Sequence, residues 1–149
     1  MPTMRFNHME LTFPRGTLTS EFRGDVDAFY GGVFGWKGVD TDLLGQSCHI
    51  LLSEEAQQFI LLAESNKPMQ SPGFDHLGLL FGTRAEVDDM LEECKRFQEK
   101  DDRVEIREYD DLVTGDLTTH AFYVKYLLPI FLDVQCMELA GEPVPNTLT

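Results

Sequence analysis

The chain has 149 residues, of which 42% are apolar, and this length and composition suit one folded domain with a buried core. It carries 26 acidic and 12 basic residues, which gives a formal net charge of −14 at pH 7. Nucleic acid and anionic membrane surfaces bind basic patches, so this charge argues against both as partners. We expect a small molecule, a cation or another protein instead.

The sequence also indicates where the protein works. It shows no signal-peptide pattern and no apolar run long enough to span a membrane. Its three cysteines, Cys48, Cys94 and Cys136, are far apart and form no C-x-x-C pair. We therefore expect free, buried thiols in a reducing compartment, and a cytoplasmic protein.

In chain order, the first half begins with a strand expected over residues 6–13, followed by a polar loop over 14–24. Apolar residues between Val26 and Val33 recur at the spacing of a helix with one buried face. The glycines at positions 35 and 38 are expected to end that helix. Three strand-like stretches follow, over residues 37–44, 48–53 and 58–63.

The second half repeats this plan after a segment, 65–73, that is rich in breakers and predicted to be a linker. A strand is expected over 74–81, and Thr83 with Glu86 forms a capping-box pattern that starts a helix. Further strands are expected over 103–109, 119–126 and 130–137, before an irregular tail over 140–149. Each half thus has the order β-α-β-β-β, and neither could bury both faces of its sheet alone.

The first strands of the two halves share a sequence pattern. FNHMELTF at residues 6–13 matches FDHLGLLF at 74–81, with Phe, His, Leu and Phe aligned at a constant offset of 68 positions. Because side chains alternate along a strand, His8 and His76 have the same phase in the two copies. Two equivalent strands that each present an imidazole could build a central metal site between two similar modules.

This repeat, together with PGFDHLGL at residues 72–79 and the final strand, is similar to the vicinal oxygen chelate superfamily. That superfamily includes glyoxalase I, extradiol dioxygenases, fosfomycin-resistance enzymes and bleomycin-binding proteins. The resemblance covers residue 5 to about 139 and implies an α+β fold in a single domain, 1–149. Two tandem βαβββ modules, about 5–64 and 74–139, would form a curved mixed sheet around a central cavity, with the helices outside.

The resemblance implies metal ligands on the first and last strands of each module. On the last strand of the second module, Asp133 stands where members usually carry a glutamate. Alignment of Phe59 with Phe131 places Leu61 opposite Asp133, and leucine cannot bind a metal. The implied ligand set is therefore His8, His76 and Asp133.

Two imidazoles and one carboxylate leave coordination positions open on ferrous iron, the metal that this set favours, with Mn²⁺ or Zn²⁺ as alternatives. The four-ligand arrangement of glyoxalase I would need a carboxylate near position 61. Glu64 has the opposite strand phase, whereas Glu10 shares the face of His8 and is a spare ligand candidate.

Residues 120–126 resemble the strand that carries acid–base groups in extradiol dioxygenases, which place a tyrosine ten residues before the last ligand. Tyr123 is ten positions before Asp133. The resemblance thus implies catalytic roles for Tyr123 and His120, although His120 is closer to Tyr123 than is usual and the family's Asp-Pro-x-Gly turn is absent. His49 and His120 show no partner at a matching position, and His49 is expected to be structural.

The resemblance leaves several functions open. The first is a metal-dependent enzyme acting on a small substrate with vicinal oxygens, most simply an extradiol-type ring-cleaving dioxygenase. The second is a glyoxalase-like lyase or isomerase that uses the metal as a Lewis acid. The third is a drug- or metabolite-binding protein without chemistry, similar to bleomycin-resistance proteins. A homodimer is expected in each case, because open sheet edges must be covered or paired.

Overall fold

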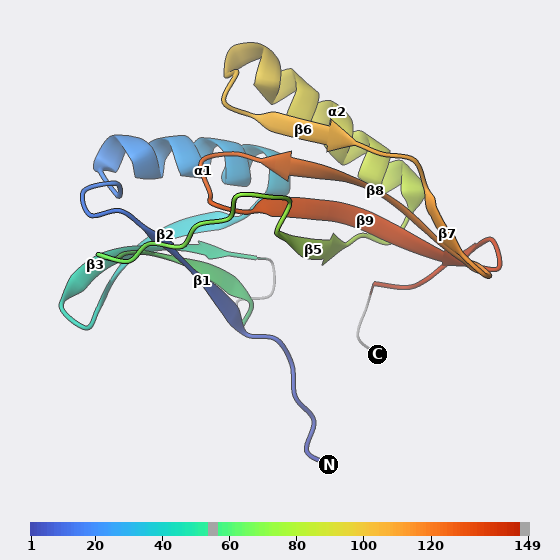
Figure 1. Cartoon of the computed structure of the whole chain (residues 1–149), viewed down its shortest axis with the longest axis horizontal. Coiled ribbons are helices and arrows are strands. Elements are labelled where there is room, and N and C mark those ends of the chain that lie inside the picture. The colour runs from blue at the N-terminus through green and yellow to red at the C-terminus, as the bar shows by residue number, and fades with distance from the viewer. Residues whose placement is uncertain (54–56, 147–149) are drawn as a thin grey trace. The chain divides into compact units, whose positions relative to one another are not determined.

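The structure, a computed structural model, describes residues 1–53 and 57–146. The chain divides into two compact units, residues 1–70 (unit one) and 71–149 (unit two), whose boundary lies inside the predicted linker. Each unit combines one long helix with one open sheet (Figure 1), so the predicted α+β class is confirmed. A single domain around a central cavity stays a prediction. No helix in the described ranges is long and apolar enough to cross a membrane.

Unit one contains a four-stranded sheet with the strand order β1-β4-β3-β2. Its strands are β1 (His8–Phe13), β2 (Lys37–Leu43), β3 (Gln46–Leu52) and β4 (Phe59–Glu64). β1 is parallel to β4, and the other neighbours are antiparallel. The sequence predicted these strands to within two residues at each end.

Helix α1 (Ser20–Phe34) begins earlier than its apolar spacing indicated. Thr19 caps it by accepting a hydrogen bond from the Phe22 amide, and Gly35, with a φ of 72°, ends it in the left-handed region. Asp27 of α1 forms a hydrogen bond with His49 of β3. His49 is paired with Leu62 of β4, so the two side chains lie on the same face of the sheet. The helix therefore covers the face of the sheet that carries the fully buried Leu62.

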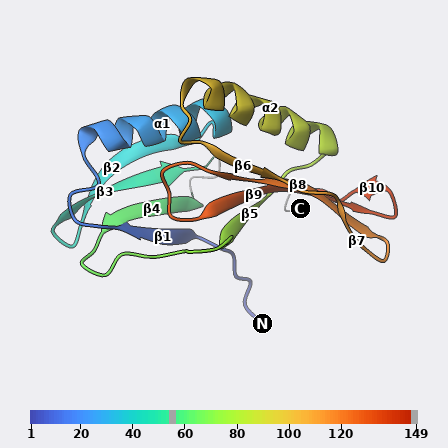
Figure 2. The same ribbon diagram turned by 45° about the horizontal axis from the view of Figure 1, so that its top comes forward.

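Unit two has a larger sheet, in which the order β10-β9-β8-β6 is joined by β5 beside β9 and β7 beside β8. Its strands are β5 (His76–Leu80), β6 (Glu105–Glu108), β7 (Leu112–Thr114), β8 (Leu117–Lys125), β9 (Phe131–Leu139) and β10 (Glu142–Pro143). Figure 2 shows the short strands β7 and β10 at the far end of the long β8–β9 pair.

Unit two departs from the sequence expectations in two places. The strand expected over 103–109 is present as β6, but a further strand that was not expected, β7, pairs with β8 along the same edge. The tail is not wholly irregular, because positive φ angles at Ala140 and Gly141 turn the chain so that β10 pairs with the end of β9. In both cases the partner strand, β8 or β9, is long, and the strands expected beside it would leave part of its backbone unpaired. The additional short strand pairs with that part.

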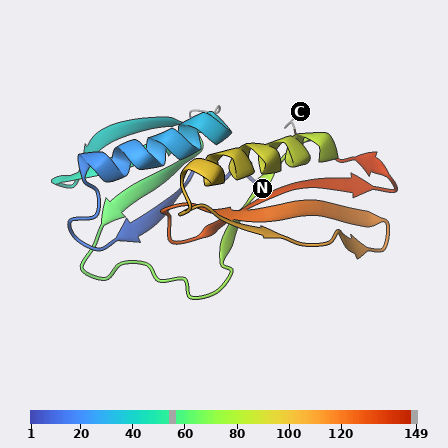
Figure 3. The same cartoon turned by 90° about the horizontal axis from the view of Figure 1, so that it is seen from above.

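Helix α2 (Arg84–Lys100) runs along β8 and β9 (Figure 3). Thr83 caps it as predicted, by accepting a hydrogen bond from the Glu86 amide. The Glu86 carboxylate accepts from the amide of Gly82 and not from that of Thr83, so the reciprocal half of the capping box is displaced by one residue. The three cysteines are free and buried, as the sequence predicted.

The registers of the two parallel strand pairs confirm the alignment of the modules. The histidine of β1 pairs with Phe59, and the histidine of β5 pairs with Phe131. Two residues further on, Leu61 and Asp133 occupy equivalent positions on β4 and β9. The asymmetry inferred from the sequence, a carboxylate in one module and leucine in the other, is thus present in the strands.

Candidate metal centre

Unit two brings His76 of β5 and Asp133 of β9 together on one face of the sheet. Nε2 of His76 lies 3.8 Å from Oδ2 of Asp133. Two ligand atoms that are each about 2.1 Å from one ion are roughly 3.0–3.4 Å apart. A small closing movement would therefore let both atoms bind one divalent cation.

The hydrogen bond of His76 prepares it for this role. Its Nδ1 lies 2.8 Å from the carbonyl oxygen of Phe74. A carbonyl can only accept, so Nδ1 carries a proton, and Nε2, the nitrogen that a metal would bind, is the one on the side of Asp133. Metal-binding histidines are commonly fixed in this way by a carbonyl or carboxylate on the other ring nitrogen.

His8 in unit one has the same tautomer for a different reason. Its Nδ1 lies 2.6 Å from Oδ1 of Asn7, and Nδ2 of Asn7 donates to the carbonyl of Gln57 at 2.6 Å. That second bond fixes the orientation of the amide, so Oδ1 accepts and Nδ1 of His8 must donate. The ring also stacks on Phe59 with its centroid at 4.8 Å, which holds an otherwise exposed imidazole in place.

Asp133 is a buried carboxylate, with a side chain that is 9% exposed. Burial raises the pKa of Asp133, and the Tyr109 hydroxyl and His76 oppose that rise. Tyr109 donates to Oδ1 at 3.0 Å, and among the ion pairs of the described residues Asp133 has His76 and no lysine or arginine. A buried anion so placed suits a metal cation, which would offset the cost of removing its charge from water.

Sequence reasoning missed Tyr109. The residue is the last of the strand expected over 103–109, but β6 ends at Glu108 and Tyr109 lies between β6 and β7, outside the alternation of either strand. Burial, followed by its bond to Asp133, raises the pKa of Tyr109, and the phenol stays protonated at neutral pH. Tyr109 thus acts as a fixed hydrogen-bond donor to the candidate ligand.

Tyr123, a predicted site residue, lies in the same cluster. It pairs with Asp133 across β8 and β9, and its ring centroid is 4.9 Å from that of His76 and 5.0 Å from that of Tyr109. Burial, followed by the charge of Asp133, raises the pKa of Tyr123. Its hydroxyl is therefore held as a proton donor beside the two candidate ligands.

The structure does not bring His120, the other predicted catalytic residue, to this cluster. His120 and Tyr123 are three residues apart on β8, so their side chains lie on opposite faces. His120 faces α2 instead, where its ring nitrogens lie 2.7 Å from carboxylate oxygens of Asp88 and Asp111. A proton shuttle by His120 to a substrate beside Tyr123 does not fit this placement.

The remaining carboxylates of the sequence analysis lie in unit one. Glu10 is exposed and shares the face of His8 on β1, which leaves it a spare candidate. Glu64 is engaged by the amide of Leu18, which donates to its Oε2 at 2.8 Å and holds the Glu64 pKa low. Leu61 is buried against Cys48.

No group of three or more His, Cys, Asp or Glu able to hold a metal occurs within the described residues. The candidate ligands are divided between the two units, with the pair His76 and Asp133 in unit two and His8 in unit one. The full ligand set of His8, His76 and Asp133 therefore stays a prediction.

Solved structures resemble the chain over most of its length. The fosfomycin resistance protein FosX from Listeria monocytogenes, in a monoclinic form at pH 5.75, aligns with a TM-score of 0.62 at 17% identity, covering 94% of each chain. A protein from Bacillus anthracis described as a glyoxalase family member aligns with a TM-score of 0.61 at 14% identity, covering 91% of this chain and 96% of the other. The chain has the vicinal oxygen chelate fold.

A second FosX structure is informative about ligands. It is a complex of a FosX variant with Mn(II) and a dihydroxypropylphosphonic acid, and it aligns with a TM-score of 0.60 at 17% identity over 94% of this chain and 92% of the other. No protein-family model matches the sequence, and a comparison with curated proteins also finds no match. The similarity is therefore one of fold.

Proposed function

We propose that this protein is a divalent-metal-dependent enzyme acting on a small substrate with two vicinal oxygens, with His8, His76 and Asp133 as the metal ligands. The observation that carries the proposal is the pairing of His76 with a buried Asp133 that has no lysine or arginine partner among the described residues. The Mn(II) and dihydroxyphosphonate in the FosX complex support the same class of metal and ligand.

Two imidazoles and one carboxylate suit Fe²⁺, Mn²⁺ or Zn²⁺, and we favour Fe²⁺ because a three-ligand set leaves positions for both a substrate and dioxygen. When bound, such a metal polarises the substrate oxygens as a Lewis acid and orients them in its open positions. Asp133 supplies the single negative charge of the set, and the two neutral imidazoles complete it.

The residues around the ligands have distinct roles. Tyr109 fixes the Asp133 carboxylate through its 3.0 Å hydrogen bond. Tyr123 holds a proton beside His76, where it can donate to a substrate oxygen. The rings of Phe74 and Phe131, with centroids 5.5 Å apart, both contact Tyr123 and form an apolar wall beside the cluster.

For the reaction we propose extradiol-type ring cleavage first, with a glyoxalase-like lyase or isomerase as the alternative. The tyrosine beside the ligands supports ring cleavage, because its hydroxyl can donate a hydrogen bond to a catechol oxygen that has already lost its proton. The FosX and glyoxalase-family neighbours support the alternative. Oxygen uptake separates the two, since a lyase or isomerase consumes none.

The test is anaerobic loading of the purified protein with Fe²⁺, followed by oxygen uptake with a panel of catechols. We expect uptake that depends on the catechol and is lost in His76→Ala. A metal-loaded protein that consumes no oxygen but isomerises or cleaves a vicinal-oxygen substrate would favour the alternative. A protein that binds no metal would contradict the proposal and favour the binding-protein function.

We also propose that the protein is a cytoplasmic homodimer. Three free, buried cysteines fit a reducing compartment. In unit one, β1 and β2 are the outer strands of the sheet, and open edges favour pairing or covering. Light scattering at micromolar concentration should give twice the chain mass, and a monomer mass would contradict the dimer.

A further inference from the structure

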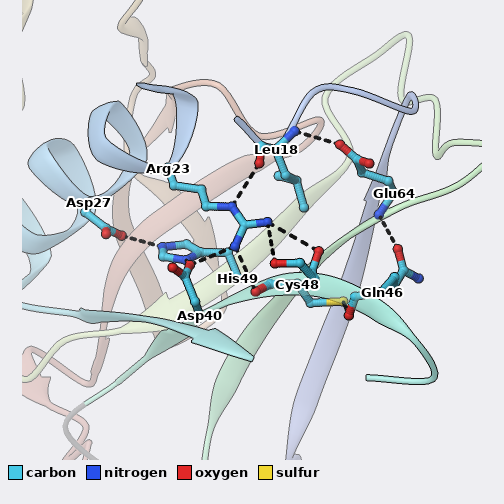
Figure 4. A network of polar contacts seen from close by, with 9 residues as sticks. Leu18, Arg23, Asp27, Asp40, Gln46, Cys48, His49 and Glu64 are labelled. Atoms are coloured by element: carbon cyan, nitrogen blue, oxygen red, sulfur yellow. Dashed lines mark hydrogen bonds and ion pairs between the residues drawn. The ribbon is translucent and has the colours of Figure 1, made fainter. Parts of the chain in front are cut away.

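A polar network joins α1 to the β2–β3 hairpin in unit one (Figure 4). The buried His49 of β3 has Nε2 2.7 Å from Oδ1 of Asp27 on the helix and Nδ1 2.7 Å from Oδ1 of Asp40 on β2. Arg23, one helical turn before Asp27, places Nη1 2.8 Å from the same oxygen of Asp40. Because carboxylates only accept, a proton on either ring nitrogen of His49 has an acceptor in place.

Unit two contains the same arrangement. Nε2 of His120 on β8 lies 2.7 Å from Oδ1 of Asp88 on α2, and Nδ1 lies 2.7 Å from Oδ1 of Asp111. Arg84, one turn before Asp88, places Nη2 2.8 Å from Oδ2 of Asp111 and 2.5 Å from Oε1 of Glu138 on β9. The helix is thus tied to the sheet by the same residue types in the same roles.

The two networks are equivalent in sequence as well as in contacts. In each, the arginine and aspartate of the helix are four positions apart, and the second aspartate is nine positions before the histidine. His49 and His120 therefore match each other, contrary to the view that neither has a partner at an equivalent position. The duplication also shows that both histidines belong to the helix-to-sheet contact.

The networks differ two residues before the second aspartate. Unit one has Gly38 there, and the Asp27 carboxylate lies so close to Gly38 that a Cβ would collide with it. Unit two has Tyr109, whose hydroxyl donates to Asp133 in the candidate metal centre. Only the second network is therefore adjacent in the chain to a residue of that centre.

The segment that carries Tyr109 has little other support from strand pairing. The β6–β8 ladder ends at Glu108 and the β7–β8 ladder begins at Leu112, so residues 109–111 lie between the two. Within this segment, the carboxylate of Asp111 is held by Arg84 and His120. Fixing Asp111 fixes the backbone two residues away, from which the Tyr109 side chain extends.

We propose that His120 is a positioning residue, which through Asp111 holds segment 109–111 in place and thereby keeps the Tyr109 hydroxyl on Asp133. In the metal centre this contact orients one carboxylate oxygen, so that the other faces His76. The proposal rests on the proposed function only in treating Asp133 as a ligand; the chain of contacts from His120 to Asp133 needs no metal.

The test compares His120→Asn with the matched control His49→Asn, which breaks the equivalent network in unit one. In metal-free protein labelled with ¹³C-tyrosine, the Cζ resonance of Tyr109, assigned by its loss in Tyr109→Phe, reports the hydrogen bond. We expect this resonance to shift toward that of a solvent-exposed phenol in His120→Asn and to stay in place in His49→Asn. An unchanged resonance in His120→Asn, or an equal shift in both variants, would overturn the proposal.

Manganese affinity gives a second reading on the same variants. Loss of an outer partner of a metal ligand costs about 10–100-fold in affinity. We expect such a loss in His120→Asn and Tyr109→Phe, no further loss in their double variant, and no loss in His49→Asn. Independent, additive losses would contradict positioning through Tyr109.

Two further outcomes remain decisive. If His120→Asn does not fold, Asp111→Asn removes the same link and is judged on the same tyrosine resonance. If the wild type binds no Mn²⁺, the proposed function fails, whereas the metal-free tyrosine resonance still supports or overturns the role of His120.

Discussion

The hydroxyl of Tyr109 donates a 3.0 Å hydrogen bond to Oδ1 of Asp133, which links the segment between two short strands to the first part of β9. This bond lowers the pKa of a carboxyl that burial raises. Tyr109→Phe should therefore raise the pKa of Asp133 above its wild-type value, because the charged form loses a donor while the burial stays. NMR titration of the ¹³C-labelled carboxyl measures it, and an unchanged or lower pKa would show that the bond is not formed in solution.

Asp133 should also give the metal-free protein a characteristic pH dependence. Its folded-state pKa is raised above the ordinary 3.8, so the folded state binds more protons than the unfolded state in that range. The free energy of unfolding should then fall as pH rises from about 4 through the folded pKa. Asp133→Asn keeps the shape and removes the titration, so urea unfolding should show a smaller fall in the variant. Parallel curves for the two proteins would contradict a buried, titrating Asp133.

His120 should act in the same sense as Asp133, but at higher pH. Burial lowers the pKa of His120, but the hydrogen bonds that its ring donates to Asp88 and Asp111 outweigh this and raise the pKa above its ordinary 6.5. With Arg84 and Glu138 also in the network, the stability from protonated His120 is complete below about pH 6.5 and is lost as pH rises through the folded pKa. Urea unfolding should show this loss in wild type and less of it in His120→Asn; an equal loss in the variant would assign it to another group.

A side chain at position 38 should destabilise the protein. A Cβ there would collide with the Asp27 carboxylate, and displacing that carboxylate leaves Nε2 of the buried His49 without its acceptor. We expect Gly38→Ala to lower the free energy of unfolding by about 1–3 kcal/mol. In Gly32→Ala, where a helical Cβ meets nothing, the free energy should instead rise by up to about 1 kcal/mol.

A double-variant cycle checks the cause of the Gly38 effect. In an Asp27→Ala background the collision is gone, so adding Gly38→Ala should cost much less than it does in wild type. Equal costs in the two backgrounds would mean that Asp27 is not what Gly38 accommodates.

The sequence alone was sufficient to predict the two-module repeat and the strand face on which each of its histidines lies. His8 and His76 lie in strands whose alternation is local, and the alignment of Leu61 with Asp133 follows from two modules of equal plan. Such features depend on spacing along the chain, which a single sequence contains.

Other features of the candidate site depend on packing between elements and could not be predicted from local spacing in the sequence. Tyr109 reaches Asp133 because the chain leaves β8 for three residues, and no local pattern marks that break. The equal spacing of Arg, Asp and His in the two halves is visible in the sequence. That these residues contact one another becomes apparent only when each helix is packed on its sheet. The prediction that His120 acts beside Tyr123 was avoidable, because two residues three positions apart on a strand point to opposite faces.

The central claim is that His8, His76 and Asp133 hold one divalent cation, and calorimetric titration of metal-free protein with Mn²⁺ tests it most directly. We predict one ion per chain in wild type. Asp133→Ala and His8→Ala should each weaken binding by at least about 100-fold while circular dichroism shows an intact fold. His49→Asn, which alters a histidine outside the centre, should bind as wild type does. Equal affinity for wild type and Asp133→Ala would contradict the account by removing Asp133 from the site, and no binding by wild type would leave a metal-free binding protein as the better description.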